Sequence, residues 1–204
     1  MRALRAQIAF AIALLAAAPA FGQTIVYTTT LSGPAENPPN ASAGTGFATV
    51  TVNTVAHTLR VQQTFSGLSA PTTASHIHCC ITTPGGNAGV ATMTPTFSGF
   101  PLGVTFGSMD QTFDTLSAAS YNPAFVTANG GVVANAEAVL FSGLSAGTAY
   151  LNVHTSAFPN GEIRGFLVAV TPVPEPETYA LFLAGLASLG VVARRRQRRE
   201  CERR

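Results

Sequence analysis

Residues 149–167 read AYLNVHTSAFPNGEIRGFL, and they decide the fold that the sequence predicts. Apolar and polar side chains alternate over Ala149–Thr155, which is the period of a strand with one face in a core. Asn160 and Gly161 then supply the positive φ angles that a tight turn needs. Glu162–Val170 is therefore predicted to return beside Ala149–Thr155 as the second strand of a hairpin.

The central part of the chain repeats this pattern. It is rich in Thr, Val, Ser, Gly and Ala, and its short alternating runs are separated by Gly, Pro and Asn, which is typical of an all-β sandwich or barrel. The other predicted strands are Ile25–Leu31, Phe47–Asn53, Thr58–Phe65, Ala74–Ile81 and Met109–Thr115. One short helix is predicted within Val133–Leu140, another helical turn within Tyr121–Asn129, and a long loop over Phe97–Phe106.

One hexapeptide, FSGLSA, occurs twice, at Phe65–Ala70 and at Phe141–Ala146. A histidine-bearing segment follows each copy, ASHIH after the first and YLNVH after the second. A structural repeat would place these two segments in related positions of the fold. The alternative is that six small residues recur by chance.

Residues 1–22 are predicted to be a secretory signal peptide. Arg2 and Arg5 precede an apolar run over Ile8–Ala17, and Ala18 and Ala20 form an A-x-A cleavage pattern. Cleavage after Ala20 or just before Gln23 fits this pattern. The mature protein is therefore expected outside the cytoplasm.

Residues 172–204 are predicted to be a second targeting segment. They contain Val173, Pro174, Glu175 and Pro176, then an apolar, predicted transmembrane segment over 178–193, then an arginine-rich end over 194–204. Positive charge beside a membrane span stays cytoplasmic, which places the middle of the chain outside.

The order of these three parts resembles a PEP-CTERM sorting tail. The resemblance implies processing by exosortase, a membrane protease of Gram-negative bacteria that make exopolysaccharide. It also implies a transient inner-membrane intermediate and a final place at the cell surface or in the extracellular matrix. A permanent C-terminal anchor that is never cut is the alternative.

Residues 23–171 remain as one domain, long enough for its own core. The formal net charge of +2 comes from arginines at the two ends of the chain, which contains no lysine. The middle has only Arg60 and Arg164, and its acidic residues are Glu36, Asp110, Asp114, Glu137 and Glu162. Nucleic acid is therefore excluded as an expected partner.

Two histidines stand one residue apart in SHIHCCI, residues 75–81. On a strand, His76 and His78 point to the same face, and on Ala149–Thr155 His154 points away from the apolar face. Such an H-x-H pair can chelate Cu²⁺ or Zn²⁺ when a neighbouring strand supplies a third ligand. The alternative is that these are exposed histidines that hydrogen-bond to the backbone of loops.

The segments FSGLSAPTTASHIH, GGNAGV and AYLNVHTSAFPNGEIRGFL resemble the CHRD (chordin-type) domain. The resemblance implies an immunoglobulin-like antiparallel β-sandwich, distantly similar to Cu/Zn superoxide dismutase. His76 and His78 match the H-x-H that supplies two copper ligands in the dismutases, and the FSGLSA repeat makes His154 the candidate third ligand. Copper is the cofactor that this implies, although no segment matches the zinc-binding loop of those enzymes.

Cys79 and Cys80 are adjacent in a chain predicted to enter an oxidising compartment. Their Cα atoms would lie ~3.8 Å apart across a trans peptide, whereas ordinary disulfides need roughly 4.4–6.8 Å. Three interpretations stay open: a vicinal disulfide, thiolates that bind Cu(I) with the histidines, and intermolecular bridges or free thiols. Cys201 is excluded as a partner because it stays inside or leaves with the tail.

Glu162 and Arg164 are two residues apart on one strand face, which predicts a surface ion pair. The alternative is that Arg164 attracts an anion to the histidines. No hydrolase triad order, carboxylate dyad or phosphate-binding loop stands out in the sequence.

Two functions compete. The sequence favours a non-enzymatic module of the cell envelope or exopolysaccharide matrix, with polysaccharide or envelope proteins as partners. The alternative is a copper-binding or redox protein with a dismutase-like histidine site.

Overall fold

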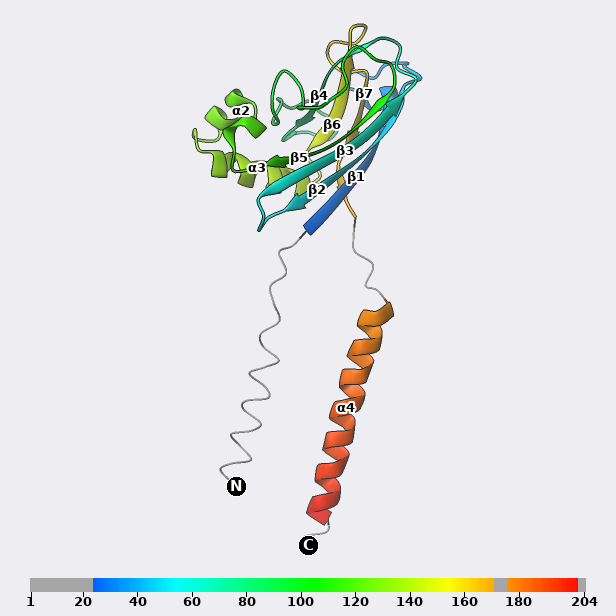
Figure 1. Cartoon of the computed structure of the whole chain (residues 1–204), viewed down its shortest axis with the longest axis vertical. Coiled ribbons are helices and arrows are strands. Elements are labelled where there is room, and N and C mark those ends of the chain that lie inside the picture. Colours follow the sequence, from blue (N-terminus) through cyan, green and yellow to red (C-terminus); the bar gives the residue numbers. More distant parts are fainter. Residues whose placement is uncertain (1–23, 171–175, 202–204) are drawn as a thin grey trace. The chain divides into compact units, whose positions relative to one another are not determined.

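The computed structural model describes residues 24–170 and 176–201 (Figure 1). The predicted signal peptide over 1–22 lies outside these residues, as do Val173, Pro174 and Glu175 of the predicted sorting motif. The described residues belong to two units, one ending at Val170 and the other beginning at Thr171, and each is described by itself.

The first unit is mostly β-structure, as predicted. Its strands are β1 (Thr24–Ser32), β2 (Thr45–Asn53), β3 (Thr58–Ser66), β4 (Thr72–His78), β5 (Gly107–Asp114), β6 (Tyr150–Thr155), β7 (Ile163–Phe166) and β8 (Val168–Ala169). Its helices are the 3₁₀ turns η1 (Gly33–Ala35) and η2 (Ala118–Ser120), and the α-helices α2 (Pro123–Ala128) and α3 (Val133–Ser145).

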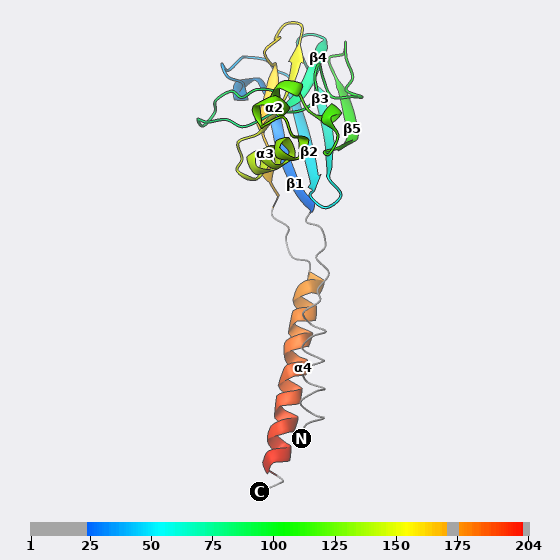
Figure 2. The same cartoon turned by 90° about the vertical axis from the view of Figure 1, so that its left-hand side faces the viewer.

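All the strands form one antiparallel sheet of order β4-β6-β7-β1-β2-β3-β5, with β8 paired to β1. The sheet curls, as the view onto α2 and α3 in Figure 2 shows. The predicted antiparallel, sandwich-like β-fold is therefore present as a single curled sheet, in which β1 and β7 join the two halves at the pair Ser32↔Arg164. A Cβ at Gly165 would collide with Thr29 and with the carbonyl of Thr30, so this close approach requires glycine.

The concave side of the sheet encloses the apolar core. Val50, Val61, Leu151, Val153 and Ile163 are fully buried there, each from the inward face of its strand. Ala136, Leu140 and Leu144 of α3 join the same core, at the four-residue spacing of one helix face. Burying this apolar surface is the main favourable contribution to folding.

The two copies of FSGLSA do not form a structural repeat, which agrees with the alternative of chance recurrence. The first copy begins at the end of β3 and continues into a loop, whereas the second lies in the last turns of α3 and just beyond them. Helix α3 is also longer than the predicted Val133–Leu140 because it runs through this second copy.

The hairpin predicted from AYLNVHTSAFPNGEIRGFL is confirmed, since β6 and β7 pair antiparallel. Its turn is longer than predicted, however, and of the two turn residues Gly161 alone has a positive φ, at 126°. The predicted strand Glu162–Val170 is divided into β7 and β8 around the buried Leu167. The loop predicted over 97–106 belongs to the long connection between β4 and β5.

The second unit contains helix α4 (Pro176–Cys201), which begins at the last residue of the predicted sorting motif. Among the residues that the structure describes, no helix has both the length and the apolar character that a membrane crossing requires. The transmembrane segment predicted over 178–193 is not supported.

Candidate metal centre

Strands β4 and β6 bring three histidines together on the convex face of the sheet. They pair antiparallel with His76 opposite Asn152 and His154 opposite Ala74, so His76, His78 and His154 share one face, as the alternation of side chains predicts. His76 Nδ1 lies 3.3 Å from His154 Nε2, and one ring nitrogen from each histidine lies within 4.8 Å of the others.

The second nitrogen of each ring faces a backbone carbonyl. His76 Nε2 lies 2.7 Å from Pro95 O, His78 Nδ1 lies 2.9 Å from Ala88 O, and His154 Nδ1 lies 2.9 Å from Pro159 O. A carbonyl only accepts, so these three nitrogens are the donors and carry the ring protons. The nitrogens that remain, His76 Nδ1, His78 Nε2 and His154 Nε2, therefore present lone pairs.

Burial keeps the three rings neutral. His76 and His78 are only 6% and 8% exposed, and this burial lowers the pKa of each to about 4. His154 is partly exposed, and burial lowers its pKa as well. Neutral imidazole is the form that binds metal ions, so all three are competent ligands near neutral pH.

Loops cover this face of the sheet. Ala88 and Pro95 belong to the connection between β4 and β5, and Pro159 to the connection between β6 and β7. The expectation that the histidines are exposed is wrong for His76 and His78, because these loops bury them. The expected bonds to loop backbone are present, but they use only one nitrogen of each ring.

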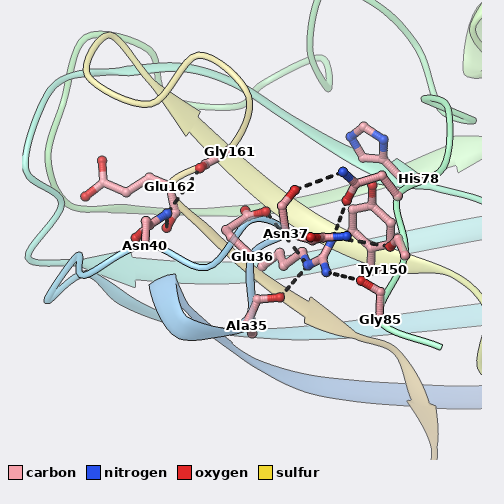
Figure 3. A network of polar contacts seen from close by, with 12 residues as sticks. Ala35, Glu36, Asn37, Asn40, His78, Gly85, Tyr150, Gly161 and Glu162 are labelled. Atoms are coloured by element: carbon pink, nitrogen blue, oxygen red, sulfur yellow. Dashed lines mark hydrogen bonds and ion pairs between the residues drawn. The ribbon is translucent and has the colours of Figure 1, made fainter.

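Arg164 braces the loop that orients His78. Its guanidinium donates to Ala35 O, to Gly85 O at 2.9 Å and to Asn87 Oδ1 at 2.8 Å (Figure 3). Ala88 follows directly in the chain, and its carbonyl accepts the His78 proton.

Tyr150 fills the space between Arg164 and His78. The His78 ring stacks on Tyr150 with centroids 4.8 Å apart and planes 4° apart, and the Arg164 guanidinium lies 4.8 Å from the same Tyr150 ring. Arg164 therefore supports His78 through the loop and through this stack.

The predicted surface ion pair between Glu162 and Arg164 is wrong, because both side chains are buried. Glu162 accepts from Ser42 Oγ and Thr155 Oγ1 at 2.6 Å, and from the Ser69 amide at 2.7 Å. The carboxylate nearest Arg164 is instead that of Glu36, with Nε and Oε2 3.8 Å apart. Anion capture by Arg164 is also unsupported, since its donors bind protein oxygens.

Three buried acceptor atoms on this side of the sheet have no hydrogen-bond partner. Across residues 24–170 the buried side-chain nitrogen and oxygen atoms in this condition are Glu36 Oε1, His78 Nε2 and Asn152 Oδ1. Burial also raises the pKa of Glu36 to about 7, against the opposing charge of Arg164. Such groups are rare in folded proteins, so each requires a physical explanation.

Neither Asn152 nor Glu36 was predicted to have a role in the site. Asn152 precedes His154 by two residues, so its place on the same strand face was readable from the alternation. Glu36 lies in a loop far away in the sequence, and no local pattern connects it to the histidines.

Cys79 and Cys80, at the end of β4, are joined to each other by a disulfide, and the peptide between them is cis, with Cα atoms 3.1 Å apart. A Cβ at Gly143 of α3 would collide with both sulfurs, so the disulfide packs directly on this glycine. The group of potential metal ligands among the described residues consists of the histidines alone and contains neither sulfur.

The CHRD domain family model matches residues 27–167, a range that includes all three histidines, Asn152, Glu36 and Arg164. The model of the PEP-CTERM protein-sorting motif matches residues 172–198. Neither a curated protein nor a solved structure matches the chain.

Proposed function

The chain belongs to the CHRD domain family, and from this premise we propose that it is an exported protein that holds a copper or zinc ion on His76, His78 and His154. The observation that carries this proposal is the convergence of three imidazole lone pairs whose opposite nitrogens are each bonded to a backbone carbonyl.

The chemistry of the three rings supports a cation between them. His76 Nδ1 and His154 Nε2 are both acceptors and lie 3.3 Å apart, so they repel each other unless a positive charge lies between them. A proton is a poor candidate, because burial lowers the pKa of both rings. Carbonyls that fix the tautomer and direction of metal-binding histidines are a common support in metal sites.

Imidazole ligands suit Zn²⁺ and Cu²⁺, and the general order of affinities favours Cu²⁺. Copper is therefore the first ion to test and zinc the second. The ion would contribute positive charge and a binding position for a further ligand. Cys79 and Cys80 are joined to each other, so the proposal leaves them out of the ligand set.

The metal proposal is tested by titrating the purified full chain with Cu²⁺ and Zn²⁺ and counting bound ions by elemental analysis. One ion per chain is expected, with loss of binding in His76→Gln and His78→Gln. His57→Gln is the matched control, because His57 lies outside the group and contacts Glu137 at 3.0 Å. Absence of stoichiometric metal, or equal binding in all variants, would overturn the proposal.

The sorting motif supports a location outside the cell. PEP-CTERM motifs imply processing by exosortase and a place at the cell surface or in the extracellular matrix of a Gram-negative bacterium. We propose that the protein acts there as a non-enzymatic module of the envelope or exopolysaccharide matrix, after loss of residues 1–22 and of the tail.

The sorting proposal is tested by replacing Glu175 together with Pro174 and Pro176. The variant should accumulate as a longer form that retains its tail, detected by mass spectrometry of the cell and medium fractions. Identical processing of variant and parent would show that the motif does not direct sorting.

A further inference from the structure

Asn152 occupies the middle of the histidine face. It is paired with His76 on β4 and with Arg164 on β7, and it precedes His154 by two residues on β6. Diagonal neighbours on one sheet face lie close enough for their side chains to meet, which brings His78 within reach as well. Asn152 is 2% exposed, and its Oδ1 has no hydrogen-bond partner.

Glu36 and Gly161 indicate which way the Asn152 amide points. The atoms nearest the position of a Cβ on Gly161 are Glu36 Oε1 at 2.5 Å and Asn152 Nδ2 at 2.9 Å. The Nδ2 end of the amide thus lies on the side of Gly161, without a hydrogen bond to the Glu36 carboxylate. The acceptor Oδ1 is the end left for the histidine side of the residue.

The site then offers a metal ion four donor atoms rather than three, because Asn152 Oδ1 joins the three histidine nitrogens. His78 Nε2 and Asn152 Oδ1 are both buried acceptors without a donor, from diagonal positions of paired strands. Four donor atoms are the usual complement of a zinc or copper site in a protein. A carbonyl oxygen is a hard ligand, which favours divalent ions over the soft Cu(I).

We propose that Asn152 Oδ1 is the fourth donor of the metal site, and that it makes the site selective for a divalent ion over Cu(I). This inference rests on the proposed metal-binding function. Asn152 is therefore a residue that determines specificity.

The test compares Cu(II) and Cu(I) affinities of the full chain, measured by competition with chromophoric chelators of each oxidation state. Asn152→Leu keeps the side-chain size and removes the oxygen. It should weaken Cu(II) binding by about 10- to 100-fold, the range typical for the loss of a supporting group in a metal site, and leave Cu(I) binding unchanged. Asn135→Leu, at an exposed position on α3, is the matched control and should change neither affinity.

A second variant keeps the proposal testable if Asn152→Leu does not fold. Asn152→Asp retains the oxygen and adds a negative charge, so it should strengthen Cu(II) binding relative to Cu(I). Equal Cu(II) affinity of the parent and Asn152→Leu, or equal losses for both oxidation states, would overturn the inference. So would an unchanged ratio of the two affinities in Asn152→Asp.

The failure of this inference is distinguishable from failure of the proposed function. If the parent binds no metal, or binds it equally well as His76→Gln and His78→Gln, the proposed function is wrong. If the histidine variants lose the metal while Asn152→Leu retains it with parental selectivity, only the role of Asn152 is wrong.

Discussion

The two faces of strands β4, β6 and β7 are both buried, but by different means and with opposite chemistry. The inward face carries Ile77, Leu151 and Val153, each fully buried against the rest of the sheet and α3. The outward face carries His76 and Asn152, which are 6% and 2% exposed because loops cover them. Alternation along the same strands thus produces an apolar core on one side and a buried polar cluster on the other.

The difference separates the face that stabilises the fold from the face that carries the proposed metal site. Removing apolar surface from water contributes about 25 cal/mol per Å², so the inward face stabilises the domain. Burying polar groups without partners costs free energy instead. The outward face retains buried acceptors without partners, and the proposed metal binding would give a physical reason for them.

The largest effect is expected on the inward face. Leu151→Ala should lower the free energy of unfolding by about 2–5 kcal/mol, because it leaves a cavity in the packed core. Urea denaturation measures this change, and metal stoichiometry should stay the same. Val168→Ala, at a residue that is 63% exposed, is the control and should have little effect. A loss equal to that of the control would contradict the assignment of the inward face as the stabilising one.

The burial of histidines on the outward face should make the stability of the metal-free protein depend on pH. The pKa of His78 is about 4 in the folded state, against about 6.5 in the unfolded chain. The unfolded chain therefore binds more protons between these values, and stability should fall as pH decreases from about 6.5 to about 4. The contribution of His78 is on the order of 3 kcal/mol.

The measurement compares the pH profile of unfolding free energy for the parent and His78→Gln, both with a chelator present. The variant should lose less stability on acidification. Glu36 acts in the opposite sense, since its raised pKa makes stability fall as pH increases from about 4.5 to about 7, but it is common to both proteins and cancels. Identical profiles would show that His78 is not held neutral by burial.

A smaller effect is expected from the support behind the histidines. Arg164→Met removes the donors to Ala35 O, Gly85 O and Asn87 Oδ1. The free energy of unfolding should fall by about 1–3 kcal/mol, because buried acceptors are left without a hydrogen bond. It should also weaken metal binding, because the loop that carries Ala88 O loses its brace. Urea denaturation and metal titration measure the two effects.

Arg60→Met provides the control for Arg164→Met. Arg60 pairs with Asp110 at 2.6 Å on the exposed side of β3, where solvent screening keeps the contribution of such a pair to stability small. It should leave metal affinity unchanged. If both arginine variants behaved alike, Arg164 would have no special connection to the histidines.

Much of the fold was predictable from local alternation. The seven predicted strands correspond to observed ones, because the period of two depends only on neighbouring residues. The joining of β1 to β7 was not predictable, since it depends on the close approach that Gly165 allows between segments far apart in the sequence. The small residues of FSGLSA fit a loop and a helix equally well, so their recurrence did not indicate a structural repeat.

The candidate site, like the fold, was predictable only where it depends on local alternation. Alternation placed His76, His78 and His154 on common faces. The carbonyls that orient the rings, such as Ala88 O and Pro159 O, come from loops whose paths no periodicity specifies. The position of Glu36 near these residues was not predictable either, because Glu36 also lies in a loop.

The central claim is tested most directly by a crystal structure of the chain grown with copper or zinc, with anomalous data collected at the absorption edge of the metal. One ion is predicted, bound by Nδ1 of His76 and by Nε2 of both His78 and His154, at about 2.0–2.1 Å for zinc. The carbonyl bonds to the other three ring nitrogens should remain. An ion bound elsewhere, or no anomalous peak among these three nitrogens, would contradict the account.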